Sequence, residues 1–193
     1  MALSLTSAIE YRHDTDPRLL DVFLEAIARG DKAALTELYH RTSASVYAFA
    51  LSILRNASDA EDVLHDTFVT IFTAGATYRS QGKPMAWILT ITRNLSLMKL
   101  RQESRTSELS QDEWALMADE HQGLTADDAL VLHKVMQNLS DQERQIVVLH
   151  ALAGFKHRET ASLLKMPLPT VISKYNRAVK KLRGLLVRGE RQS

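Results

Sequence analysis

Apolar residues recur every three to four positions along most of this chain, and that spacing is the strongest constraint on its fold. Over residues 59–72 they fall on one face of a helix with 3.6 residues per turn, and the acidic residues fall on the opposite face. Glycine and proline, which interrupt such patterns, number only 7 and 4 among 193 residues. The sequence therefore predicts an all-α protein.

Start and stop signals divide the first part of the chain into helices. One helix is expected from about Pro17, a favourable first-turn residue, to Gly30. Asp31 is expected to cap the next helix, whose pattern continues to Leu54 with a possible break at Thr42–Ser45.

The next two helices frame a polar loop. Ser58 and Glu61 have the spacing of a capping box, which predicts that a helix begins there. Residues 75–84 contain two glycines and are expected to form a loop. A helix is then predicted from about Pro84 to Glu103, buried except along a stripe of Thr90, Arg93, Asn94 and Arg101.

The second part of the chain begins after an acidic, weakly periodic stretch. Residues 106–124 are predicted to be a linker, with helices resuming near Thr125. Ser140 and Glu143 form a second capping-box pattern, and that helix is expected to end at Gly154.

Two further helices complete this part of the chain. A short segment is expected over residues 156–164, followed by a break at Pro167 and Pro169. The final helix is expected from Thr170 to about Val187.

The distribution of charge divides the chain in the same way. Residues 1–100 have a balance of −1, residues 101–132 of −6 and residues 133–193 of +8. The fold class is therefore expected to be all-α, with two small helical domains joined by a flexible acidic linker, and the basic block is a candidate for nucleic-acid binding. The expected segments are a tail over 1–16, a domain over 17–105, a linker over 106–124, a domain over 125–188 and a tail over 189–193.

The final helix carries a line of basic residues on one side. Val171 and Ala178 share the apolar face, and the preceding short helix and tight turn complete a helix-turn-helix pattern. In that motif the second helix enters the major groove with its N-terminus first. A solvated basic face is the alternative. The residues expected to reach bases and phosphates are Thr170, Ser173, Lys174, Arg177 and Lys181.

The acidic helix over 59–72 also raises the possibility of a metal site. Asp62 and His65 have the i, i+3 spacing of a di-iron motif, but that chemistry needs a second copy and further inward carboxylates, which this sequence lacks. The acids also lie opposite the apolar face. We therefore expect no metal, no cofactor and no enzymatic activity. Helix capping remains an alternative role for Asp59, Glu61 and Asp62.

Three further features bear on location. The chain has no cysteine, so it forms no disulfides and is suited to a reducing cytoplasm. Its longest apolar run, near residues 46–54, is far shorter than the roughly 20 residues of a membrane span. The N-terminal segment lacks the features of a signal peptide. The expected location is cytoplasmic.

These patterns together resemble a bacterial sigma factor of the extracytoplasmic-function (ECF) group of the sigma-70 family. The stretch "DAEDVLHDTF" resembles part of the family's polymerase-binding region, and "MAWILTITRNLSLMKLRQESR" resembles the helix that recognises and melts the −10 element. The stretch "LSDQERQIVVLHALAGFKHRETASLLKMPLPTVISKYNRAVKKLRGLL" resembles the −35 reader.

The resemblance implies a transcription initiation factor with core RNA polymerase, promoter DNA and an anti-sigma factor as partners, and with no catalytic site. It implies polymerase binding by Asp59, Glu61, Asp62, His65 and Asp66. It implies −10 contacts by Tyr78, Arg79, Arg93, Asn94, Arg101 and Arg105. The alternative function is a free-standing helix-turn-helix regulator, which would leave residues 18–103 without a role.

Several residues depart from the family pattern. Met98 and Gln102 stand where an aspartate and an arginine are usual, and Pro169, Ile172 and Lys174 replace a glycine, a lysine and an arginine. A lysine cannot reproduce the two-pronged contact of an arginine with guanine, so the resemblance carries no promoter sequence with it.

Overall fold

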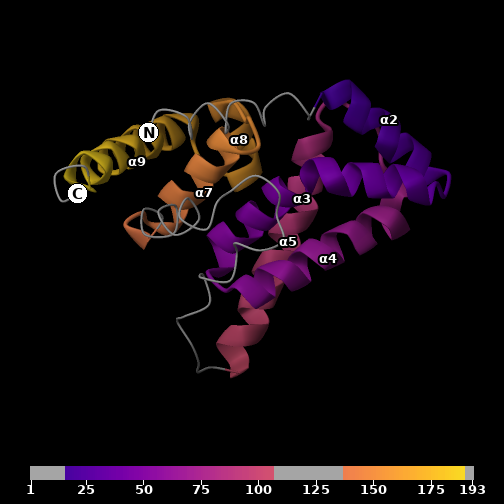
Figure 1. Ribbon diagram of the computed structural model, residues 1–193, viewed down its shortest axis with the longest axis horizontal. Coiled ribbons are helices and arrows are strands. Elements are labelled where there is room, and N and C mark those ends of the chain that lie inside the picture. Colours follow the sequence, from indigo (N-terminus) through magenta and orange to yellow (C-terminus); the bar gives the residue numbers. More distant parts are fainter. Residues whose placement is uncertain (1–15, 107–136, 190–193) are drawn as a thin grey trace. The chain divides into compact units, whose positions relative to one another are not determined.

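The computed structural model describes residues 16–106 and 137–189, and the chain forms two compact units, residues 1–113 and 114–193. Within the described ranges every regular element is a helix (Figure 1). The predicted linker over 106–124 and the helix expected near Thr125 lie outside the described residues, apart from Thr106.

The first unit begins with α2, Pro17–Ala28, which starts where the sequence predicted. Asp16 caps it by accepting a hydrogen bond from the Arg18 backbone N–H at 2.9 Å, and Pro17 occupies the first position, where no N–H is needed. The helix ends two residues before Gly30, whose φ of +88° favours glycine.

The second helix, α3, is continuous over Lys32–Leu54, so the expected break at Thr42–Ser45 is wrong. Asp31 caps it through the backbone N–H groups of Ala33 and Ala34. The Thr42 hydroxyl donates to the Leu38 carbonyl at 2.7 Å, one turn earlier, and is thereby satisfied inside the helix. Hydroxyl residues therefore sit in this helix without interrupting it.

The third helix, α4, spans Ala57–Ala74 and is capped by Asn56 rather than by Ser58. The Asn56 side-chain oxygen accepts from the Asp59 backbone N–H at 2.9 Å. Arg55 takes the left-handed conformation, with φ of 60°, and turns the chain directly into this cap. The predicted Ser58–Glu61 capping box is therefore wrong, because an earlier residue already fills that role.

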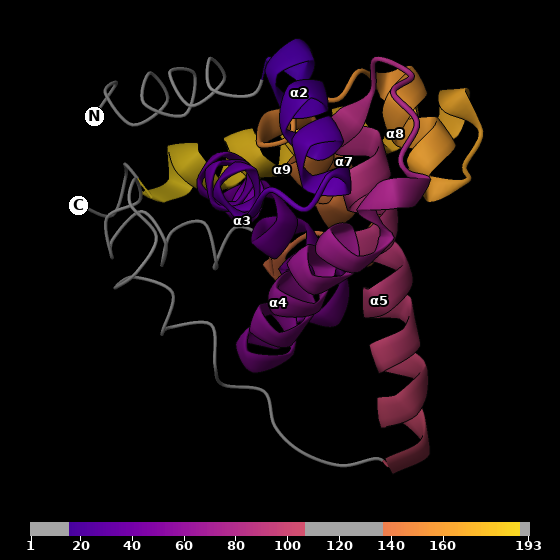
Figure 2. The same cartoon turned by 90° about the vertical axis from the view of Figure 1, so that its right-hand side faces the viewer.

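The unit ends with a short 3-10 helix and a long α-helix. The 3-10 helix η2, Gly75–Thr77, occupies the start of the predicted loop, and α5 runs over Pro84–Thr106, three residues beyond the predicted end. The last turns of α5 extend past the other helices of the unit (Figure 2).

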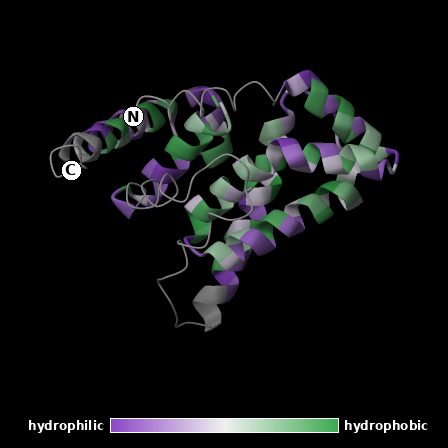
Figure 3. Cartoon of the chain, viewed as in Figure 1, coloured by the Kyte–Doolittle hydropathy of each residue, from purple (hydrophilic) through white to green (hydrophobic). Residues whose placement is uncertain are grey.

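Hydrophobic side chains from all four α-helices of this unit form one core. The helices show alternating hydrophobic and hydrophilic residues along their length, as expected for amphipathic elements (Figure 3). Burying each large side chain stabilises the fold by about 1.5–3 kcal/mol. The largest fully buried side chains are Leu20, Leu24, Ile27, Leu38, Val46, Phe49, Val63, Ile71, Ile88 and Leu89.

The second unit contains α7, Asp141–Ala151, α8, His157–Leu164, and α9, Leu168–Gly189. The predicted capping box of Ser140 and Glu143 is present at the start of α7. Helix α9 begins two residues earlier than predicted. Pro169 lies within its first turn, where a missing N–H costs nothing, so it does not break the helix.

In residues 16–106 and 137–189, no helix is both long enough and apolar enough to cross a membrane.

Candidate polymerase and nucleic-acid interfaces

The outward face of α4 is acidic. Glu61, Asp62, His65 and Asp66 are exposed, while Val63 lies on the buried side of the helix. Asp59, the remaining residue expected to bind polymerase, is only 17% exposed at its side chain. Four of the five residues are therefore placed to meet a partner.

A lysine on α5 contacts two of the α4 acids. Lys99 Nζ lies 2.7 Å from Asp59 Oδ1 and also donates to Asp62 Oδ2. Burial works against the charged form of Lys99, but the two carboxylates outweigh it and hold the pKa of Lys99 above its usual range. These two contacts hold the first turns of α4 against α5.

Among the described residues, no group of three or more His, Cys, Asp or Glu side chains is arranged to hold a metal ion. The acids of α4 spread along the outside of the helix, with Lys99 between two of them. Their arrangement suits a cationic protein surface better than a metal.

Apolar side chains are exposed near the acids. The Tyr39 ring on α3 packs on the Phe68 ring of α4 with centroids 4.8 Å apart, yet remains exposed. Val69, one turn after His65, is also exposed. Exposed apolar residues beside charged ones are typical of interaction surfaces.

Tyr78 is held inside the first unit. Its hydroxyl donates to Asp21 on α2, its ring meets Trp87 of α5 edge-on at 4.9 Å, and the residue is buried. Burial and the bond to Asp21 raise the pKa of the Tyr78 hydroxyl. The ring offers little open surface on which a base could stack.

Arg79, predicted with Tyr78 to contact −10 DNA, bonds its own loop. One of its terminal nitrogens donates to the carbonyls of Ala76 and Tyr78 at 2.9 and 2.8 Å. The residue is exposed, so the guanidinium remains at the surface.

The exposed stripe of α5 differs slightly from the one predicted. Arg93 is half-buried, and Met98 takes a place on the exposed face. The side chain of Arg105 lies outside the described residues. The exposed positions are Thr90, Asn94, Met98, Arg101 and Gln102.

In the second unit, α8 and α9 form the predicted helix-turn-helix. Val171 and Ala178 are fully buried and define the core side of α9. Ile172, Ser173 and Asn176 are exposed. Ile172 and Asn176 are absent from the predicted reader set, although their spacing from Val171 and Ala178 places them on the outward face.

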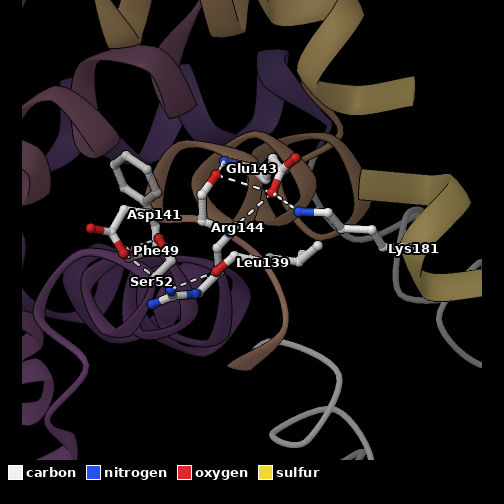
Figure 4. Close-up of polar contacts among 8 residues, drawn as sticks. Phe49, Ser52, Leu139, Asp141, Glu143, Arg144 and Lys181 are labelled. Carbon is white, nitrogen blue, oxygen red and sulfur yellow. Dashed lines mark hydrogen bonds and ion pairs between the residues drawn. The ribbon is translucent and has the colours of Figure 1, made fainter. Parts of the chain in front are cut away.

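The remaining predicted reader residues lie on one flank of α9. Arg177 is exposed, whereas Thr170 and Lys174 are half-buried. Lys181 has a partner inside the unit, since its Nζ lies 2.7 Å from Glu143 Oε2 of α7 (Figure 4). On the same turn of α7, Arg144 bonds the Asp141 carboxylate at 3.1 Å.

Three rings join the helices of this unit. His150 of α7 and His157 of α8 stack with centroids 5.0 Å apart, and both contact the Tyr175 ring of α9. The His150 Nδ1 atom lies 2.9 Å from the Phe155 carbonyl. The cluster holds α9 against α7 and α8.

Two family models match the chain. The model described as sigma-70 region 2 matches residues 38–106, and the model described as sigma-70 region 4 matches residues 129–182. Together they cover more than half of the sequence, in the order in which the two units occur.

Curated relatives match over most of the chain. The ECF RNA polymerase sigma factor SigK of Mycobacterium sp. (strain KMS) is 26% identical over 174 residues, which is 86% of this chain and 90% of the relative. SigK of Mycobacterium tuberculosis (strain ATCC 25177 / H37Ra) is 26% identical over 180 residues, covering 88% and 96%.

Two solved structures share the fold. One is CnrH in complex with the cytosolic domain of CnrY, with a TM-score of 0.58, 22% identity and coverage of 90% of this chain and 98% of that one. The other is the sigma factor RpoE in complex with the anti-sigma factor NepR from Bartonella quintana, with a TM-score of 0.63, 23% identity and coverage of 78% and 95%.

Proposed function

The chain belongs to the sigma-70 family of transcription initiation factors, in its extracytoplasmic-function group, and from that premise we propose that it directs core RNA polymerase to specific promoters. Unit 1 carries the polymerase contact and the −10 contact, and unit 2 carries the −35 contact. Factors of this family are not enzymes, because the polymerase supplies the chemistry.

The polymerase contact is assigned to the acidic face of α4. The exposure of Asp62 and Asp66, one turn apart, supports this assignment. Tyr39 and Val69 provide exposed apolar surface of the kind that forms the centre of a protein interface. The partner surface is expected to be basic, with apolar residues at its centre.

The −10 contact is assigned to the exposed stripe of α5. Asn94 and Arg101 on this stripe can contact bases and the strand backbone. Arg79 is exposed and remains a candidate at the edge of this surface. Tyr78 is a weaker candidate, because its ring is buried against Trp87.

The observation that carries the −35 assignment is the exposed face of α9. Asn176 suits an adenine, Arg177 suits a guanine, and the apolar Ile172 suits the methyl group of a thymine. All three side chains are exposed, in the second helix of a helix-turn-helix.

Run-off transcription with purified chain and core polymerase, followed by start-site mapping, tests the proposal. We expect promoter-specific transcripts that core polymerase alone does not make. Asn176→Ala should reduce the preference for one adenine by about 1–3 kcal/mol. Arg177→Ala should lower the level of the promoter-specific transcript further. Arg29→Ala, which removes an exposed positive charge from unit 1, is the matched control and should leave transcript levels unchanged.

Sequence-specific DNA binding without any polymerase-dependent transcript would instead favour a free-standing regulator. Loss of the transcripts with Arg29→Ala as well as with Arg177→Ala would contradict the assignment of −35 reading to α9.

Control by an anti-sigma partner is part of the proposal. The two solved structures described above each contain a second protein, one of them named as an anti-sigma factor. A partner that covers the α4 acids would block polymerase binding. We expect such a protein to co-purify from the native cells and to stop run-off transcription. An active chain with no co-purifying inhibitor would contradict this part of the proposal.

A further inference from the structure

The capping box at the start of α7 also reaches the recognition helix. Glu143 Oε2 accepts a hydrogen bond from Lys181 Nζ at 2.7 Å (Figure 4). The same oxygen accepts from the Ser140 backbone N–H and hydroxyl, both at 3.0 Å. One carboxylate oxygen thus serves three donors. Its side chain is 3% exposed, whereas that of Lys181 is 41% exposed.

Lys181 continues the basic line of α9 that begins at Lys174 and Arg177. The three residues are spaced three and four apart, so they share one flank of the helix. From sequence alone Lys174 and Arg177 would be expected to reach bases and phosphates, and Lys181 a phosphate. The ammonium of Lys181, however, already contacts Glu143.

Breaking this contact is unfavourable. Burial works against the charged form of Glu143, but Lys181 and Ser140 outweigh it and hold the pKa of this carboxyl below its usual value. If Lys181 turned to a phosphate, a buried carboxylate would lose its counter-charge, which costs more than an exposed phosphate contact returns.

We propose that Glu143 withholds Lys181 from the DNA backbone and thereby limits the DNA affinity of unit 2. Glu143 is a positioning residue in this scheme, because it acts through Lys181 and touches no DNA. The inference rests on the proposed function of α9. It predicts that removing the negative charge of Glu143 on α7 strengthens DNA binding.

The test uses the full chain and a short random-sequence DNA duplex, because backbone contacts are independent of sequence. Glu143→Gln removes the charge but keeps an oxygen that can accept the Ser140 bonds, since glutamine also forms capping boxes. Released to a phosphate, Lys181 should steepen the slope of log K against log salt by about 0.9. Affinity at about 0.1 M salt should rise roughly 5- to 10-fold.

Two further variants separate this effect from a change in net charge. Lys181→Met should leave the salt slope of the wild-type chain unchanged, and should abolish the gain when combined with Glu143→Gln. Asp141→Asn removes one charge from the same turn of α7, but Asp141 pairs with Arg144 rather than Lys181. It should leave the slope unchanged.

Each outcome decides the proposal. A fall in slope for Lys181→Met in the wild-type chain would show that Lys181 already binds phosphate, and would overturn it. An unchanged slope for Glu143→Gln, with Arg177→Ala still lowering it, would overturn the inference and leave the proposed function intact. If Arg177→Ala also had no effect, both would fail. Should Glu143→Gln not fold, the salt slope of Lys181→Met in the wild-type chain still tests whether Lys181 already binds phosphate.

Discussion

Lys99 on α5 places its ammonium 2.7 Å from Asp59 on α4 and bonds Asp62 one turn further along the same helix. The helix assigned to polymerase binding is therefore tied to the helix assigned to −10 DNA by a single cation. Asp59 serves this internal contact and is 17% exposed, while Asp62 is 66% exposed and still faces outward. The acids of α4 thus have different roles despite their similar spacing.

Replacing Lys99 with methionine should loosen α4 against α5. The partly buried Asp59 would lose its partner, and we expect a cost of about 1 kcal/mol. Because the pKa of Lys99 is raised, its contribution is complete below the usual lysine pKa of about 10.4 and is lost only as pH rises through the higher folded value. A measurement at neutral pH therefore reports the full effect.

Amide hydrogen exchange of the α4 and α5 peptides measures this change within unit 1. Lys83→Met, at an exposed lysine of the loop before α5, is the control and should leave exchange unchanged. If the α4 and α5 amides were protected from exchange equally in Lys99→Met and Lys83→Met, the Lys99 contacts would contribute nothing to stability.

Reversing the charges of Asp62 and Asp66 should weaken binding to core polymerase. We expect a loss of about 1–3 kcal/mol, roughly 5- to 150-fold in affinity, because attraction to a basic surface becomes repulsion. The circular-dichroism spectrum should stay helical, since both side chains are exposed and Lys99 keeps Asp59 as a partner. Glu25→Lys reverses an exposed acid on α2 and should bind normally. Undiminished affinity of the double variant would remove α4 from the interface.

Local signals in the sequence predicted most helix starts. Pro17, Asp31 and Ser140 each act within four residues of their own position, so their roles are readable without a tertiary structure. The failures arose where two local options competed. Asn56 and Ser58 are both favourable N-cap residues. Which of them becomes the N-cap of α4 depends on the turn at Arg55, and the sequence pattern does not predict that turn.

Contacts between helices were beyond the sequence pattern. Lys99 meets Asp62 across 37 residues, and Lys181 meets Glu143 across 38. His150 stands alone in the sequence but stacks on His157 in space. Periodicity gives the face on which a residue lies, whereas the residue opposite it depends on how two helices pack.

Replacing Tyr78 distinguishes an anchor from a stacking platform. Tyr78→Phe keeps the ring but loses the hydrogen bond to Asp21, so we expect unit 1 to lose about 1–2 kcal/mol of stability. Thermal unfolding and exchange in α2 report this loss. If Tyr78 served only to stack a base, Tyr78→Phe would keep wild-type stability, and Tyr78→Ala would abolish promoter melting without lowering stability.

The stability of unit 2 should depend on pH through Glu143. The Lys181 and Ser140 bonds hold the pKa of Glu143 in the folded protein below its ordinary value of 4.5, in spite of its burial. A depressed pKa contributes stability that is present above the unfolded value and is lost as pH falls through the folded value. Wild type and Glu143→Gln should therefore differ by a constant amount at neutral pH, and the difference should shrink below about pH 4.5.

Hydrogen exchange of α7 and α9 peptides, corrected for intrinsic rates at each pH, measures this difference. Lys181→Met removes one of the bonds that lower the Glu143 pKa, so its pH-dependent loss of stability should be smaller than in wild type, because the folded pKa moves toward the unfolded value at which the loss begins. Asp141→Asn should leave the size of this loss unchanged, because the ion pair of Asp141 is with Arg144. A difference between wild type and Glu143→Gln that stayed constant to pH values well below 4.5 would show that the folded protein does not stabilise the charged form of Glu143.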